Sequence, residues 1–111
     1  MKQVNIIFSL SLCWTALLFG CSSGPEKKTP KAYTVEIKQM QFQPADLKVE
    51  SGDTVVFKNE DMVAHDITEA SSKKWSSGAL PSGQSWKLVV VQKADYYCSI
   101  HPVMKGRLEV R

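Results

Sequence analysis

Four side chains in this sequence are of types that bind copper. Cys98, His101 and Met104 lie near the C-terminus in a Cys-x2-His-x2-Met spacing, and His65 is the only other histidine of the chain. Thiolate and thioether sulfur favour Cu(I), whereas imidazole nitrogen also suits Cu(II), so the set fits copper in both oxidation states. Magnesium and calcium prefer oxygen ligands, and zinc gains little from a thioether. The residue types and their spacing therefore predict a copper site.

Predicted strands on either side of these residues bring them together. Residues 95–98 and 106–111 have the composition of strands, so a short loop between them delivers three side chains to one point. Pro102 stiffens that loop because its ring fixes φ. His65 follows a turn region at 59–64 and comes from a different strand. We expect a rigid site whose geometry changes little between oxidation states, as fast electron transfer requires.

The rest of the chain after residue 32 also has the pattern of short strands separated by turns. Apolar and polar residues alternate at 33–38 and 47–50, and residues 54–58 and 86–91 are rich in β-branched and aromatic side chains. No apolar stripe with helical spacing follows the N-terminal segment. The fold class that this pattern predicts is all-β, an antiparallel β-sandwich.

The N-terminal segment has the features of an export signal. Lys2 is followed by an apolar run to Phe19 that is too short and too interrupted for a membrane span. The sequence Leu-Phe-Gly-Cys that ends at Cys21 resembles a bacterial lipobox, in which the chain is cut before the cysteine and the cysteine is acylated. We predict a lipoprotein signal peptide at 1–20, a membrane anchor through lipid on Cys21, and a location facing the periplasm or the cell exterior. An ordinary signal peptide cut nearby, or an uncleaved anchor, is the alternative.

The segment that follows is predicted to be a flexible tether. Residues 21–32 contain two prolines, three lysines and no large apolar side chain, so they cannot bury enough surface to fold. The folded domain is then expected at 33–111. Removal of the signal takes away Cys13, and a lipid on Cys21 leaves Cys98 without a disulfide partner. Because a lone thiol in an oxidising compartment is reactive unless something occupies it, a metal role for Cys98 is favoured.

The ligand spacing and the segment 57–66 resemble the cupredoxins of the plastocyanin and amicyanin type. The short loop at 98–104, with His-Pro-x-Met followed by a basic residue and glycine, is similar to that of amicyanins. The resemblance covers nearly all of residues 33–111. It implies an eight-stranded Greek-key sandwich, the cupredoxin fold, with one type 1 copper per chain.

The same resemblance implies a role for each ligand. His65, Cys98 and His101 would form the trigonal plane of a blue copper site, and Met104 would be the long axial ligand. The second ring nitrogen of His65 would be held by another group of the protein. His101 would present its free edge to solvent as the electron port, near which redox protein partners dock transiently.

One departure from the family pattern lies beside the first histidine, where Asp66 stands in place of the usual asparagine. Its backbone amide is placed to donate to the Cys98 sulfur, and its carboxylate to accept from Ser99. We expect the negative charge to stabilise Cu(II) and to lower the reduction potential relative to asparagine.

These observations favour a monomeric electron-transfer protein, not an enzyme, that cycles one copper between Cu(II) and Cu(I). The alternative is a copper-binding module that delivers copper to another cuproprotein, although such sites are usually more exposed. Catalysis with Cys98 as nucleophile and His101 as base is a third class, for which the sequence has no oxyanion-hole or substrate motif. A net charge of +3 without a basic stripe argues against nucleic-acid binding.

Overall fold

A computed structural model describes Gly20 and residues 28–111 of the chain. Most of the predicted signal peptide and the first part of the predicted tether, including Cys21, lie outside the described residues. Within 28–111 the chain forms strands, turns and irregular segments, and no helix in the described part is long and apolar enough to cross a membrane. The strands are β1 (Ala32–Lys38), β2 (Gln41–Gln43), β3 (Asp46–Val49), β4 (Thr54–Asn59), β5 (Thr68–Glu69), β6 (Ser85–Val89), β7 (Ala94–Tyr97) and β8 (Lys105–Val110).

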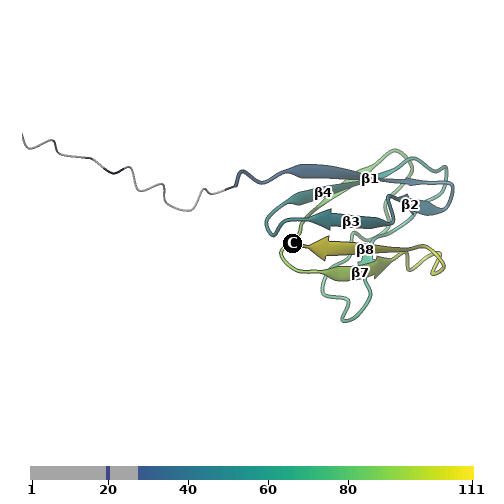
Figure 1. The fold of residues 1–111 in the computed structure, drawn as a ribbon. Coiled ribbons are helices and arrows are strands. Elements are labelled where there is room, and N and C mark those ends of the chain that lie inside the picture. The colour runs from purple at the N-terminus through teal and green to yellow at the C-terminus, as the bar shows by residue number, and fades with distance from the viewer. Residues whose placement is uncertain (1–19, 21–27) are drawn as a thin grey trace, which may run out of the picture.

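The strands form two four-stranded sheets, in the orders β2-β1-β4-β6 and β3-β8-β7-β5 (Figure 1). The predicted all-β sandwich is thereby confirmed. One detail is corrected, because β1 runs parallel to β4 and β3 runs parallel to β8, whereas the other pairs are antiparallel. The chain leaves the first sheet after β2, forms β3 in the second sheet and returns as β4. This double crossing places β4 beside β1 in the same direction.

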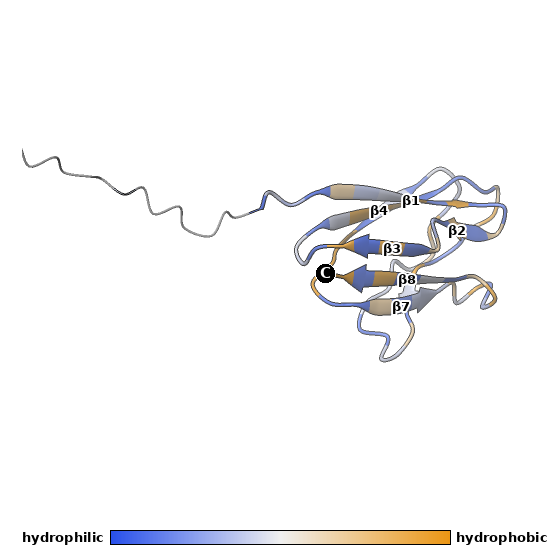
Figure 2. Ribbon diagram, viewed as in Figure 1, coloured by the Kyte–Doolittle hydropathy of each residue, from blue (hydrophilic) through white to orange (hydrophobic). Residues whose placement is uncertain are grey.

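Apolar residues on the facing sides of the sheets form the core. Ile37 of β1 and Phe57 of β4 are fully buried, as the period-two alternation of each strand predicts. The Tyr96 ring from β7 packs between aromatic rings, with centroids 5.3 Å from Phe57 and 4.8 Å from Phe42. Figure 2 shows apolar and polar residues following one another along strands such as β8, so each strand contributes one side to the core.

Gly106 leaves room for the Tyr96 ring. The two residues are directly opposite in the pairing of β7 with β8, so both face the core. An ideal β-carbon at position 106 would overlap the Cζ and hydroxyl oxygen of Tyr96. The hydroxyl itself is buried without a hydrogen-bond partner among the described residues, and burial raises the pKa of the Tyr96 phenol.

Three connections meet at one end of this sandwich. β7 ends at Tyr97 and β8 begins at Lys105, so the predicted ligand loop joins these two strands at the end of β8 opposite the C-terminus (Figure 1). The segment between β4 and β5 carries His65 and Asp61. The amide of Met40, in the turn between β1 and β2, donates a hydrogen bond to the Asp61 carboxylate. The fold therefore places all the predicted ligands at this end.

Candidate metal centre

His65, Cys98 and His101 come together at the end of the sandwich. The sulfur of Cys98 lies 3.8 Å from Nδ1 of His65 and 3.8 Å from Nδ1 of His101. The three donor atoms all lie within 4.8 Å of one another, and no other such group of side chains is found in the described part of the chain. Cys98 and His65 are fully buried, whereas His101 is only partly buried. The cluster therefore has one edge near solvent.

Met104 lies on the same short loop as Cys98 and His101. The amide of Cys98 donates to the carbonyl of Met104 (3.1 Å), and the amide of Met104 donates to the carbonyl of His101 (2.9 Å). These bonds close the loop, and Met104 is 2 % exposed, so its thioether lies inside the fold. Pro102 and Val103 stand out from the loop into solvent.

The backbone around His65 is fixed from two sides. His65 forms an antiparallel bridge with Leu80, in which its amide donates over 3.2 Å and its carbonyl accepts over 2.7 Å. The side chain of Asn59, fully buried at the end of β4, donates to the carbonyls of Leu80 (2.9 Å) and Val63 (2.8 Å). Asn59 was not among the positioning residues predicted from the sequence. An amide side chain at the end of a buried strand is the signal that marks it.

Asp61 is a second residue that the sequence analysis missed. Its Oδ2 lies 2.8 Å from Nε2 of His65, so Nδ1 is the ring nitrogen left to face Cys98. The carboxylate also accepts from the amides of Gln39 (2.7 Å) and Met40 (3.0 Å). Burial alone would raise the pKa of Asp61, but the hydrogen bonds from Met40, His65 and Gln39 lower it overall. The sequence signal is an acid four residues before a histidine ligand.

Asp66 links the two segments that carry the ligands. Its amide donates to the Cys98 sulfur over 3.3 Å. One carboxylate oxygen accepts from the Ser99 amide (2.7 Å) and from the Thr68 hydroxyl (3.0 Å), and the other accepts from the Ser99 hydroxyl. These are the contacts expected for Asp66 and Ser99. Cys21, the predicted lipid site, lies outside the described residues.

The loops around the cluster carry exposed apolar side chains. Met62 is 92 % exposed and Val103 87 %, and Met40, Val63 and Ile100 are each at least 40 % exposed. An exposed apolar surface of this kind is typical of a site where another molecule docks.

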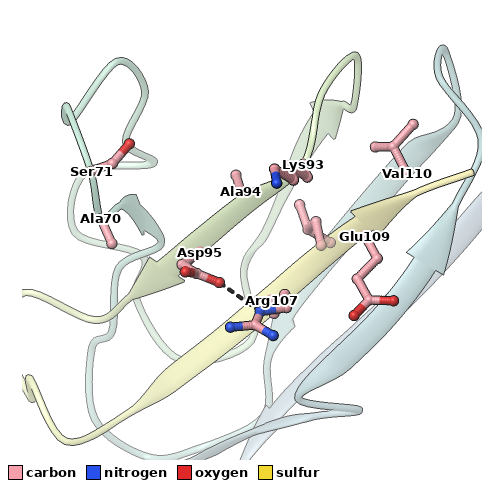
Figure 3. Close-up of a pocket in the computed structure, with 9 residues that line it drawn as sticks. Ala70, Ser71, Lys93, Ala94, Asp95, Arg107, Glu109 and Val110 are labelled. Atoms are coloured by element: carbon pink, nitrogen blue, oxygen red, sulfur yellow. Dashed lines mark hydrogen bonds and ion pairs between the residues drawn. The ribbon is translucent and has the colours of Figure 1, made fainter.

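A groove elsewhere on the surface has a different character. Figure 3 shows its lining residues on β7 and β8 and at Ala70 and Ser71, among them Arg107 and Asp95, which form an ion pair of 2.8 Å. Its lining residues Ala94 and Val110 belong to the strand ends remote from the 98–104 loop. Its side chains form no metal-ligating cluster, so we place the chemistry at the His65, Cys98 and His101 cluster.

Comparison with known proteins finds a matching family and two related proteins. Residues 10–110 match the model of a family described as Cupredoxin-like domain. Amicyanin-alpha of Methylorubrum extorquens is 27% identical over 101 residues, which cover 86% of this chain and 85% of that protein. Amicyanin of Paracoccus denitrificans is 28% identical over 88 residues, covering 71% of this chain and 65% of that protein.

Solved structures also superpose on this chain. A methionine-to-alanine mutant of amicyanin in the Cu(I) form superposes with a TM-score of 0.67 and 26% identity, covering 72% of this chain and 82% of that one. A copper-containing nitrite reductase from Thermus scotoductus superposes with a TM-score of 0.66 and 28% identity, covering 75% of this chain. The match spans only 22% of the reductase chain.

Proposed function

The chain belongs to the cupredoxin-like domain family, and on that premise we propose that it carries single electrons through one type 1 copper ion. The observation that carries the proposal is the placement of three donor atoms around one point, with both Nδ1 atoms 3.8 Å from the Cys98 sulfur. Metal bonds of about 2.0–2.3 Å to nitrogen and sulfur, in a trigonal plane, put such atoms about 3.8 Å apart. The spacing of this chain therefore fits a metal ion.

The four ligands are assigned by what each can offer. His65 and His101 would bind the ion through Nδ1 and Cys98 through its sulfur, and the buried Met104 would offer its thioether as a fourth ligand. A bound copper ion supplies the one-electron couple between Cu(II) and Cu(I). The donor set suits both states, because imidazole accommodates Cu(II) and the two sulfurs accommodate Cu(I).

The surroundings favour transfer of electrons over exchange of the metal. Asp61 orients His65, Asp66 joins the Cys98 and His65 segments, and backbone bonds close the loop to Met104. A cage fixed in this way needs little rearrangement when the charge of the ion changes. The partly buried His101, with the exposed apolar residues of neighbouring loops, offers a face where redox protein partners can dock briefly.

A copper-delivery module is the second candidate, and retention of the metal separates the two. We expect the copper-loaded protein to keep its ion through repeated reduction and reoxidation in the presence of a Cu(I) chelator. A His101→Ala variant, which opens the exposed side of the cage, serves as the control that loses Cu(I). Transfer of copper from the wild-type protein to the chelator at the first reduction would favour delivery and overturn the carrier role.

Enzymatic activity is not part of the proposal. A copper oxidase or reductase usually has a second metal site, and the proposed site already uses both histidines of this chain. The matched nitrite reductase is also far longer than this chain. Acylation at Cys21 and export to the periplasm or cell exterior complete the proposal, and mass spectrometry of the mature N-terminus would test the lipid.

A further inference from the structure

Two methionines beside the candidate centre reach the surface, Met62 almost fully exposed and Met40 in part. Met62 is 92 % exposed and Met40 is 40 % exposed, whereas Met104 is buried. A methionine that contributes to a core stabilises the fold by burying its side chain. Little such burial is available to Met62, so core packing does not account for it.

One carboxylate places both methionines. The amide of Met40 donates to Oδ2 of Asp61 over 3.0 Å, and Met62 is the residue that follows Asp61. The same Oδ2 lies 2.8 Å from Nε2 of His65. A methionine side chain has three rotatable bonds and a polarizable sulfur, so each thioether can adjust its position toward a bound ion. The Asp61 carboxylate thus lies between the two methionines and His65, a ligand of the candidate centre.

The backbone at Met40 is unusual for its residue type. Gln39 and Met40 have φ angles of 54° and 58°, the left-handed region that glycine or asparagine adopts at lower cost. Asp61 holds this turn through both amides. A glycine at position 40 would make the turn more easily but would carry no thioether.

We propose that Met40 and Met62 form a second, weaker site that captures Cu(I) at the rim of the protein and passes it to the main centre. Two thioethers are soft ligands, which prefer Cu(I) to the hard cations and to Cu(II). The negative charge of Asp61 adds attraction for a cation. The passage to the main centre rests on the proposed function, whereas the binding of Cu(I) to the methionine pair does not.

The experiment counts Cu(I) ions bound by the full chain under anaerobic conditions. All variants carry Cys13→Ser and Cys21→Ser, so that thiols outside the described residues do not bind the metal. The reference protein is expected to take two Cu(I) ions, the second of which shifts the methyl resonances of Met40 and Met62. The double variant Met40→Leu and Met62→Leu is expected to take one.

Two controls separate this site from an apolar docking surface. Leucine keeps the apolar character of both positions, and the exposed Val63 and Val103 can be changed to leucine on the same face without removing sulfur. The valine variants are expected to keep both ions. A reference protein that takes one Cu(I), or a double leucine variant that still takes two, overturns the proposal. Failure of the main function would instead show as the absence of a blue spectrum after one equivalent of Cu(II).

Discussion

The carboxylate of Asp61 lies 2.8 Å from Nε2 of His65 and thereby connects a buried ligand to the turn between β1 and β2. Two residues of that turn, Gln39 and Met40, donate their amides to the same carboxylate. The carboxylate that holds the His65 ring is therefore itself held by a segment that lies more than twenty residues earlier in the chain.

Replacement of Asp61 tests this connection. Asp61→Ala leaves the ring nitrogen of His65 and two amides without their acceptor, so we expect a loss of about 1–3 kcal/mol in the free energy of unfolding. We also expect an altered copper EPR spectrum, because the ring of His65 is no longer held. Urea unfolding and EPR of the copper-loaded protein measure the two effects. The neighbouring exposed Glu60→Ala is the matched control, and equal behaviour of the two variants would contradict the role of Asp61.

Replacement of Asp66 tests the effect of charge on the copper couple. Asp66→Asn keeps the amide bond to the Cys98 sulfur and an oxygen for Ser99, but removes a negative charge within a few ångströms of the ligands. Because the charge stabilises Cu(II) more than Cu(I), its removal should raise the reduction potential, by on the order of 100 mV at a local effective dielectric of about 20. Protein-film voltammetry provides the measurement. A potential that is unchanged or lower in Asp66→Asn would show that the carboxylate does not act through its charge.

A side chain at position 106 should disturb the core beneath the ligand loop. Gly106→Ala brings a methyl group into the space of the Tyr96 ring, so we expect a loss of about 1–3 kcal/mol from overpacking. Thermal unfolding measures the loss, and Lys105→Ala, at the exposed neighbouring position, should change little. Combining Gly106→Ala with Tyr96→Leu relieves the overlap, so the two changes together should cost less than their sum. Strict additivity would mean that the ring does not set the requirement for glycine.

Lowering the pH should remove the contribution of Glu69 to the free energy of unfolding. The hydrogen bond from Ser71 comes first among the causes that lower its pKa to about 2, opposed by burial and supported by the Lys74 amide and by Ser72. A carboxyl with a folded-state pKa below its unfolded value of 4.5 stabilises the fold above that value and loses the contribution as pH falls toward about 2. The difference in unfolding free energy between wild type and Glu69→Gln should therefore shrink from about pH 6 to about pH 3. Glu109→Gln, at an exposed position, provides the baseline, and a difference for Glu69→Gln that is constant with pH would contradict the assignment.

Much of the fold could be predicted from the sequence because the long strands alternate cleanly. β1, β4, β7 and β8 match segments in which apolar and polar residues alternate or β-branched residues gather. One strand, β2, was not predicted, and the strand expected to start at His65 begins only at Thr68 as β5, since His65 itself forms an isolated bridge. β2 has three residues with one buried apolar side chain, Phe42, and β5 has two, Thr68 and Glu69, which are buried although polar. In such short segments no periodicity can be recognised.

The candidate site, like the fold, could be predicted only in part. Cys98, His101 and Met104 lie on one loop, so their spacing in the sequence already specifies their proximity. Asp61 accepts hydrogen bonds from backbone amides of a distant turn. Because backbone amides do not depend on residue type, the sequence of the turn gives no signal of this contact. Only the tertiary arrangement of β1, β2 and β4 reveals that contact. The boundaries of the signal peptide, tether and domain, and the lipid on Cys21, stay predictions.

Optical and EPR spectra of the full-length protein loaded with one equivalent of Cu(II) test the central claim most directly. We expect an intense visible charge-transfer band from the Cys98 thiolate and a narrow copper hyperfine splitting, because one thiolate and two imidazoles would bind the ion together. Cys98→Ser should lose both features while His65 and His101 still bind the ion. A weak visible band with wide hyperfine splitting in the wild-type protein would show an ordinary Cu(II) complex and contradict a type 1 electron-transfer site.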